Sequence, residues 1–354
     1  MRLPPISPSA VRKVALASVI GYALLMITGG AVRLTGSGLG CPDWPSCYHH
    51  QLTANVSFHP LVEFVNRLIT IVITILSGVA LLAALARSPR RRDLCWLGGG
   101  LVAGVGAQIV LGGIVVLSRL NPYLVACHFL LTIVILADAV VFYHRSGVDA
   151  AHSESESASL VPSDLRWLAR VLVTTLGVVC SVGTIVAGAG PHAGSPSSPG
   201  QPIQRIPIAF RDIAEAHADV AIFLIGLCLA SLYAFRRPGL PAVVLRRLYW
   251  LFELLVLQGV LGYLQYFLHD NALVIEFHIA GVAALWIAAV AFYLSLHEHL
   301  LRYDTPGVGD TSAGKTRGDG GGSGPGGGGG GGGGGKRDSV RIPVGTPSVV
   351  TGAT

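Results

Sequence analysis

Long apolar stretches separated by short polar segments recur along the chain. Each is close to the length of about 20 residues that a helix needs to cross a bilayer. Helices also bond every backbone group internally, as hydrocarbon requires. We expect eight spans, at 14–32, 61–86, 94–117, 124–143, 167–188, 212–234, 243–267 and 273–297. The pattern therefore predicts an all-α membrane protein with eight transmembrane helices.

Composition indicates that lipid is the solvent around these helices. Of the 354 residues, 51% are apolar and only 12% are charged, and the mean hydropathy is +0.61. A soluble domain carries about twice that share of charged residues. From about Thr305 the chain is glycine-rich, with an unbroken glycine run at 326–335. We expect this tail to be disordered.

Basic side chains gather in alternate loops, which fits membrane topology and not nucleic-acid binding for a net charge of +6. They are Arg12, Lys13, Arg87, Arg90, Arg91, Arg92, Arg145, Arg166, Arg236, Arg237, Arg246, Arg247 and Arg302. The positive-inside rule places both termini in the cytoplasm, and it places the loops 33–60, 118–123, 189–211 and 268–272 outside. The segment before the first span is too short for a mitochondrial transit peptide. We therefore expect an uncleaved anchor in a bacterial plasma membrane.

Two of the six cysteines, Cys41 and Cys47, lie in the first outward loop as C-P-D-W-P-S-C. That compartment is oxidising and the spacing is short, so a disulfide is predicted, with two free thiols as the alternative. The other cysteines are interpreted as small apolar side chains of the helices: Cys95, Cys127, Cys180 and Cys228. The sequence has no C-x-x-C-H motif, so any heme is held without thioether links.

The sequence aligns with itself at an offset of about 150 residues. The aligned pairs are Gln108 to Gly112 with Gln258 to Gly262, Asn121 with Asn271, His128 with His278, Asn66 with His217, and Gly36-Ser-Gly38 with Gly188-Ala-Gly190. Four helices separate the copies, so both copies have the same orientation in the membrane. We predict two parallel four-helix repeats, related by an axis along the membrane normal.

The repeat suggests a division of the chain into five parts. They are an N-terminal cytoplasmic segment (1–13), an N-terminal four-helix half (14–145), a cytoplasmic linker (146–166), a C-terminal four-helix half (167–300) and the glycine-rich tail (301–354).

Three histidines are candidates for binding heme iron. His217 and His278 each lie about five residues into a span that enters from the outer face, roughly 7–8 Å deep at 1.5 Å per residue. Two imidazoles at equal depth are what a bis-histidine heme needs, and His128 has the same depth in the fourth span. The alternative is hydrogen bonding between helices; zinc would need more ligands than gather here.

The remaining histidines are expected to be solvated. His49, His50, His59, His192 and His269 are assigned to loops, and His144, His152, His297 and His299 to the cytoplasmic side.

Glu63 is a further candidate, because a charged side chain at the start of the second span is costly to place in a membrane. Asn66 and Arg67 follow three and four positions later, and the i, i+3 spacing puts Glu63 and Asn66 on one helix face. A carboxylate near the membrane is a functional candidate. The alternative is an interfacial salt bridge to Arg67. Glu276, two residues before His278, points to a different face and is assigned to the interface.

Taken together, these residues resemble the heme A synthase family. The motifs that carry the resemblance are Arg33-Leu-Thr-Gly-Ser-Gly-Leu-Gly-Cys-Pro-Asp-Trp-Pro-Ser-Cys47, Glu63-Phe-Val-Asn-Arg67, the glycine loop Ala187–Gly194 and the histidines of the fourth, sixth and eighth helices. The resemblance covers about 14–297. It implies oxidation of the C8 methyl of heme O to a formyl group, which makes heme A for cytochrome c oxidase.

The resemblance also implies site residues. The C-terminal half holds heme b through His217 and His278, and the N-terminal half binds heme O at His128, with Asn66 and Arg67 beside it. The chemistry of this oxidation, rather than the resemblance, predicts the role of Glu63: a carboxylate near the methyl carbon can stabilise the cation that forms there and accept a proton as water adds, so Glu63 is the predicted catalytic residue.

Two departures from the family pattern matter. Where many members have E-x-x-H-R, this chain has Asn66, which leaves His128 as the only protein ligand to the substrate iron. The loop 189–211 also lacks the second cysteine pair of some members.

The expected partners are heme O synthase and the terminal oxidase assembly. Two alternatives stay open: a diheme b-type cytochrome that only transfers electrons, and a non-catalytic heme carrier or transporter.

Overall fold

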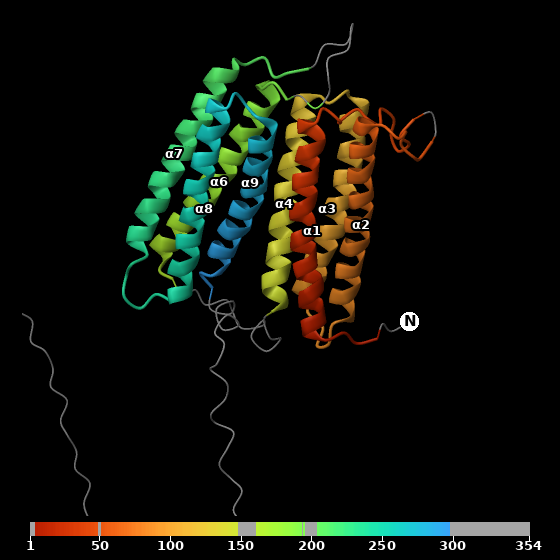
Figure 1. The fold of residues 1–354 in the computed structure, drawn as a ribbon. Coiled ribbons are helices and arrows are strands. Elements are labelled where there is room, and N and C mark those ends of the chain that lie inside the picture. The colour runs from red at the N-terminus through yellow and green to blue at the C-terminus, as the bar shows by residue number, and fades with distance from the viewer. Residues whose placement is uncertain (1–3, 49–50, 148–160, 193, 195–203, 298–354) are drawn as a thin grey trace, which may run out of the picture. The chain divides into compact units, whose positions relative to one another are not determined.

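Eight helices make up the described part of the chain, and all eight predicted spans are confirmed as helices (Figure 1). The computed structural model describes residues 4–48, 51–147, 161–192, 194 and 204–297, and no strand occurs among them. The helices are α1 (Pro8–Leu34), α2 (Phe58–Ala86), α3 (Arg92–Leu117), α4 (Pro122–Ser146), α6 (Ser163–Ala189), α7 (Phe210–Ala234), α8 (Ala242–Phe267) and α9 (Ala272–Leu294). Several begin a few residues earlier than predicted, and the last ends at Leu294 rather than at 297.

The starts of α4 and α9 share one local structure. The side chain of Asn121 accepts a hydrogen bond from the Tyr123 amide, and that of Asn271 accepts one from the Leu273 amide. Such a cap satisfies a backbone N–H that the helix itself leaves without a partner. In each case the two residues before the asparagine have positive φ: Arg119, Leu120, His269 and Asp270. This conformation thus recurs at the predicted offset, while the symmetry of the two halves remains a prediction.

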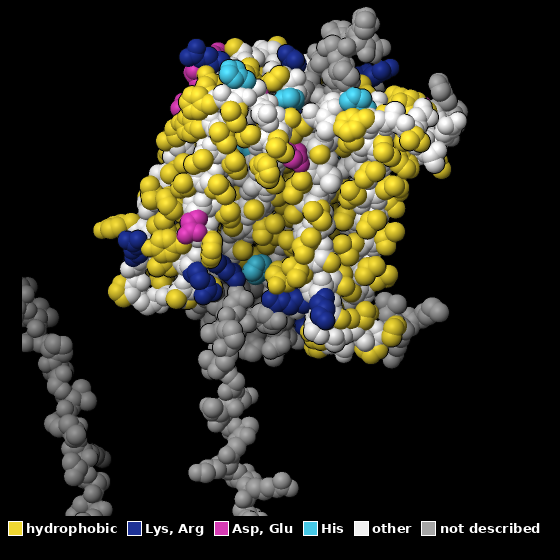
Figure 2. All heavy atoms as spheres, viewed as in Figure 1, with side chains coloured by type: hydrophobic (Ala, Val, Ile, Leu, Met, Phe, Trp, Pro, Cys, Tyr) yellow, Lys and Arg dark blue, Asp and Glu magenta, His cyan; other side chains and the backbone are white. Residues whose placement is uncertain are grey.

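Seven of the eight helices are long and apolar enough to cross a membrane. The exception is α8, which carries Arg246, Arg247 and Glu253 along its length, so its crossing remains a prediction. Large apolar side chains point outward from the bundle, for example Val134 with 63% and Trp96 with 82% exposed. Figure 2 shows apolar side chains over the visible face, with lysine and arginine confined towards the ends of the helices. A lipid-facing surface explains this distribution.

Two apolar cores hold the helices together. The first lies mainly among α1, α2, α3 and α4, includes Tyr22 and Phe142, and extends to Ala283 of α9. The second lies mainly among α6, α7, α8 and α9 and extends to Ile133 of α4. The two groups of helices meet where α1 and α4 contact α9 and where α4 contacts α6. There the Trp286 indole of α9 donates to the Ile133 carbonyl of α4 at 2.9 Å.

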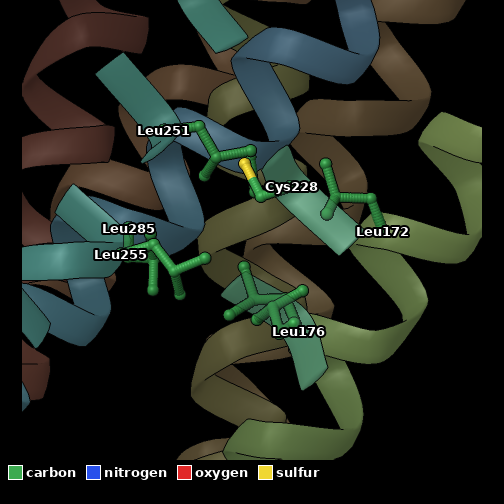
Figure 3. A pocket seen from close by; sticks show the side chains of 8 residues that line it. Leu172, Leu176, Cys228, Leu251, Leu255 and Leu285 are labelled. Atoms are coloured by element: carbon green, nitrogen blue, oxygen red, sulfur yellow. The ribbon is translucent and has the colours of Figure 1, made fainter. Parts of the chain in front are cut away.

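A small gap remains inside the second core (Figure 3). Its walls come from all four helices of that half and are apolar: Leu172, Leu176, Leu224, Cys228, Leu251, Leu255, Leu285 and Ala289. The gap offers no charged or amide group that could orient a ligand, so we assign it to imperfect packing.

Some sequence predictions lie outside the described residues. These are the disorder of the tail from Thr305, most of the linker 146–166, and the solvation of His49, His50, His152 and His299.

Candidate functional site

The loop between α1 and α2 is closed by a disulfide, as predicted. Cys41 and Cys47 are bonded, with their Cα atoms 4.3 Å apart, and both are buried. Between them Trp44 reaches α3: a Cβ built at Gly113 would lie 2.6 Å from the indole ring. The loop therefore spans from the start of α2 to the C-terminal part of α3.

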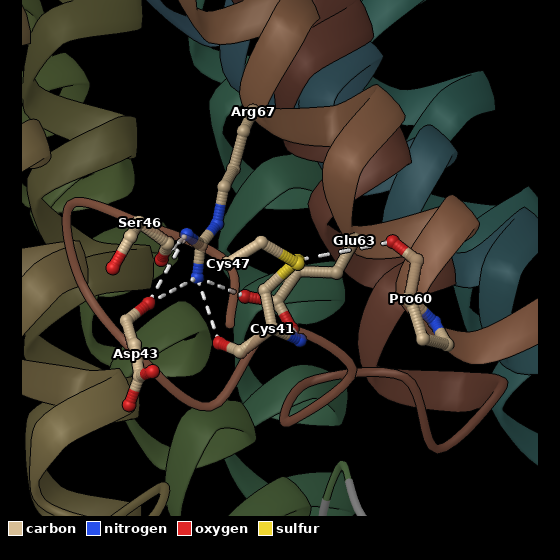
Figure 4. A network of polar contacts seen from close by, with 7 residues as sticks. All are labelled: Cys41, Asp43, Ser46, Cys47, Pro60, Glu63 and Arg67. Atoms are coloured by element: carbon tan, nitrogen blue, oxygen red, sulfur yellow. Dashed lines mark hydrogen bonds and ion pairs between the residues drawn. A yellow bond between two sulfur atoms is a disulfide. The ribbon is translucent and has the colours of Figure 1, made fainter. Parts of the chain in front are cut away.

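Arg67 of α2 holds this loop in place (Figure 4). Its Nη1 donates to the carbonyls of Ser46 at 2.9 Å and Asp43 at 3.2 Å, and its Nη2 donates to those of Cys41 at 2.9 Å and Asp43 at 3.2 Å. The same Nη2 pairs with Glu63 Oε1 at 2.6 Å. A planar guanidinium is suited to gather several oxygens in this way.

Both carboxylate oxygens of Glu63 are engaged. Oε1 pairs with Arg67, and Oε2 accepts the Cys41 amide at 2.8 Å. The residue is only 5% exposed. The salt bridge, which was the alternative interpretation of Glu63, is therefore present. It does not exclude chemistry, because the same contacts fix a negative charge at a defined place beside the disulfide loop.

Asn66 lies on the same helix and is held from α1. The Thr28 hydroxyl donates to Asn66 Oδ1 at 2.8 Å. Asn66 and Glu63 do not hydrogen-bond to His128 in the part of the chain that the structure describes. The disulfide loop and His128 instead contact neighbouring residues of α3: Trp44 packs on Gly113, and the His128 ring packs on Gly112.

The three candidate histidines have one arrangement in common. His128 follows the first residue of α4 by six positions, His278 follows that of α9 by six, and His217 follows that of α7 by seven. Each Cε1 faces a glycine of a neighbouring helix. A Cβ at Gly112, Gly183 or Gly262 would lie 3.2, 3.1 or 3.7 Å from the Cε1 of His128, His217 or His278, respectively.

These surroundings fit iron-binding imidazoles. Each ring has a buried Nδ1 without a hydrogen-bond partner among the described residues, which is costly unless a bound group compensates. No three metal-binding side chains gather in the described residues. One or two imidazoles are sufficient as axial ligands when a macrocycle supplies the other ligands to iron.

The loops that follow α1 and α6 interlock through Arg33, which the sequence analysis named only as the first residue of a family motif. Arg33, at the end of α1, donates to the His192 carbonyl at 2.7 Å and to the Ala187 carbonyl. The Gly38 amide donates to the Gly194 carbonyl at 2.7 Å. The only signal in the sequence was a basic residue in a loop assigned to the outer side.

Two loop histidines differ from expectation. His192 is half-buried, and its Nε2 hydrogen-bonds to the Asp270 carbonyl at 2.8 Å, because the interlocked loops enclose it. His59 lies in the first turn of α2 rather than in the loop, since that helix begins at Phe58, and its Nδ1 hydrogen-bonds to Ser37 Oγ at 3.1 Å.

Two carboxylates lie inside helices, Glu276 in α9 and Asp138 in α4. Both carboxylate oxygens of Glu276 are buried, and Oε2 lies 3.0 Å from a Cβ built at Gly30, because α9 packs against α1 on this face; its interfacial depth stays a prediction. Asp138 was overlooked, although a single acidic residue in an apolar run was a visible signal. Its Oδ2 is buried without a partner among the described residues, 2.6 Å from a Cβ built at Gly100.

Comparison with known proteins places these features in a family. The family model COX15-CtaA, described as cytochrome oxidase assembly protein, matches residues 12–290. A heme A synthase of Geobacillus thermodenitrificans is 38% identical over 112 residues, 31% of this chain and 35% of that protein. One from Geobacillus kaustophilus is 36% identical over 107 residues, 30% and 33% of the two chains. A third, from Lysinibacillus sphaericus, is 27% identical over 154 residues, 43% and 50%. The chain thus spans a third to a half of the length of these curated relatives.

Proposed function

The chain belongs to the COX15-CtaA family of cytochrome oxidase assembly proteins, and we propose that it is a heme A synthase. In this proposal it oxidises the C8 methyl of heme O to a formyl group and so makes heme A for a terminal oxidase. The observation that carries the proposal is the set of three histidines in the predicted spans. Each ring packs against a glycine of a neighbouring helix, and each Nδ1 is buried without a hydrogen-bond partner among the described residues. The heme A synthases among its relatives support the substrate.

The C-terminal half would hold the resident heme. His217 and His278 are its two proposed axial ligands, and their matching positions near the starts of α7 and α9 support the pairing. When bound, heme b supplies a one-electron carrier. The helix walls around the two rings exclude water and hold the imidazoles at one depth.

The N-terminal half would bind heme O as substrate. His128 is the proposed ligand to its iron, next to the wall formed by Gly112. Asn66 is not proposed as a ligand, because its side-chain oxygen already accepts the Thr28 hydroxyl. The substrate iron then has one protein ligand, and the site should be five-coordinate or hold an exchangeable sixth ligand.

Glu63 is the proposed catalytic carboxylate. Conversion of a methyl to a formyl group takes one oxygen from water and releases four electrons and four protons, the electrons passing to an external one-electron acceptor. Positive charge develops at the methyl carbon as electrons leave. A carboxylate fixed by Arg67 and the Cys41 amide can stabilise that charge without reorganising, and it can accept a proton when water adds.

The decisive test is to identify the hemes in purified protein and to follow heme O. We expect b-type heme in the wild type and heme A, or its alcohol precursor, from added heme O. His217→Ala and His278→Ala should lose the low-spin b-type spectrum. Glu63→Gln should retain heme O but form no heme A. A diheme cytochrome would bind heme and leave heme O unchanged, and a transporter without heme would be colourless.

The proposed setting is a bacterial plasma membrane, with both termini in the cytoplasm and two parallel four-helix repeats. Charged groups at the N-terminal end of α3 and the C-terminal end of α4 support the orientation: Asp93 bridges Arg91 at 2.5 Å and Arg145 at 3.3 Å. His297, just beyond α9, is half-buried among arginines, and burial together with the charges of Arg166, Arg145 and Arg170 lowers its pKa. Heme O synthase and the terminal oxidase are the proposed partners.

A further inference from the structure

Two glutamines lie beside the candidate ligand histidines in matching places. Gln108 of α3 donates through Nε2 to the main-chain carbonyl of His128 at 3.0 Å. Gln258 of α8 donates through Nε2 to the carbonyl of His278 at 3.3 Å. Both glutamines are buried, at 7% exposure each. A buried amide in an apolar helix is costly, so its hydrogen bonds need a full account.

In each glutamine the side-chain oxygen has no hydrogen-bond partner among the described residues. The two N–H bonds of Gln108 go to the His128 carbonyl and to Thr132 Oγ1, the latter at 2.5 Å. Among the described residues, Oε1 of Gln108 is buried without a partner, and so is Oε1 of Gln258. The Nδ1 atoms of His128 and His278 are likewise buried with no partner in that part of the chain. Each half thus has one unmet acceptor and one potential donor on residues that already share a hydrogen bond, and an unmet buried group costs roughly 1–3 kcal/mol.

The spacing along the helices supports a connection between these groups. Gln108 lies one turn before Gly112, on which the His128 ring packs, and Gln258 lies one turn before Gly262, on which the His278 ring packs. Each ring therefore faces the helix that carries its glutamine. Gln258 is also confined, because a Cβ at Gly281 would overlap its Nε2.

His217 follows the same spacing with a different acceptor. Its ring packs on Gly183, and the main-chain carbonyl of Val179, one turn before that glycine, lies near the imidazole without a hydrogen bond to its Nδ1 among the described residues. All three histidines therefore have an acceptor one turn before their glycine, and in two of them that acceptor is a side chain.

We propose that Gln108 and Gln258 are positioning residues whose Oε1 atoms accept the Nδ1 protons of His128 and His278 when Nε2 binds iron. The inference rests on the proposed heme sites. A metal-bound imidazole almost always donates its other N–H to an acceptor, which fixes its tautomer and orientation and increases its basicity. A stronger acceptor makes the imidazole a stronger donor to iron and favours the ferric state.

The test uses Gln258→Leu and Gln258→Glu, with Gln265→Leu as the matched control. Gln265 lies two turns further along α8 and donates to Asp270 Oδ1 at 3.2 Å. The measurements are heme b retention, reduction potential and low-spin electron paramagnetic resonance, with helix content by circular dichroism as a check of folding that does not depend on heme. We expect Gln258→Leu to retain heme about 10- to 100-fold less tightly and to raise the potential. Gln258→Glu should keep heme and lower the potential, and Gln265→Leu should match the wild type.

The outcomes separate this inference from the proposed function. A wild type without b-type heme would overturn both. A wild type with heme, and a Gln258→Leu variant with unchanged potential and resonance, would overturn only the role of the glutamine. Loss of heme in Gln258→Glu equal to that in Gln258→Leu would overturn it too, because it would assign the effect to the Nε2 bond with the His278 carbonyl. In the other half, Gln108→Leu should lower the iron–histidine stretching frequency of ferrous heme O bound at His128, and an unchanged frequency would contradict the proposal there.

Discussion

Replacement of Arg67 should release the disulfide loop from α2. Arg67→Met keeps the apolar stem of the side chain and removes five hydrogen bonds, four to loop carbonyls and one to Glu63. Glu63 would then be a buried carboxylate, 5% exposed, with the Cys41 amide as its remaining partner. Removal of one member of a buried ion pair typically costs about 3–5 kcal/mol.

We therefore expect Arg67→Met to lower the free energy of unfolding by about 3–5 kcal/mol. The five bonds share one loop and one guanidinium, so their separate contributions do not add. The double variant Glu63→Gln/Arg67→Met should recover part of the loss, because no uncompensated charge is then buried. Arg67→Lys should be intermediate, since an ammonium keeps the charge but lacks the planar fork that reaches several carbonyls.

The assay is reversible unfolding in mixed detergent micelles, together with alkylation of Cys41 and Cys47 after mild reduction. Arg211→Met is the matched control. It breaks another i, i+4 pair, Arg211 with Glu215 at 2.7 Å, but the side chains are 78% and 60% exposed, so no measurable change is expected. If Arg67→Met unfolds like the wild type and its disulfide is reduced no faster, the loop is held by something other than Arg67.

Three further changes test the packing of the sites. Gly183→Ala should displace the His217 ring, whose Cε1 is 3.1 Å from the added Cβ, and weaken heme b binding by an overpacking cost of about 1–3 kcal/mol. Gly226→Ala, with open space around it, is the control, and equal heme spectra in both variants would show that the ring does not need the space at Gly183. Gly113→Ala should displace Trp44 and lower the melting temperature, measured by circular dichroism, and an unchanged melting curve would mean that the indole is not held there. Asp138→Asn should be at least as stable as the wild type, because its buried Oδ2 has no partner; a large loss of stability would show that the carboxylate has a partner that matters.

The sequence by itself determined the helices and the disulfide. Eight apolar runs of helical length leave the backbone few alternatives in hydrocarbon, and eight helices occur. Two cysteines six residues apart can meet without help from distant parts of the chain, and they do. The histidines are also found at nearly the predicted positions in their helices, because position along a helix follows from counting residues from its start.

Only the tertiary structure decided what those residues touch. The carbonyl partners of Arg67 come from a loop more than twenty residues earlier. Those of Arg33 come from the last turn of α6 and from His192 after it, 154 and 159 residues later. The choice of neighbouring helices also decides that Glu276 is buried against α1. It likewise decides which glycines lie against the histidine rings. A periodic pattern states which face of a helix is apolar, but it does not name the helix that covers that face. Contacts between distant segments form only when the whole bundle packs, so no local pattern encodes them.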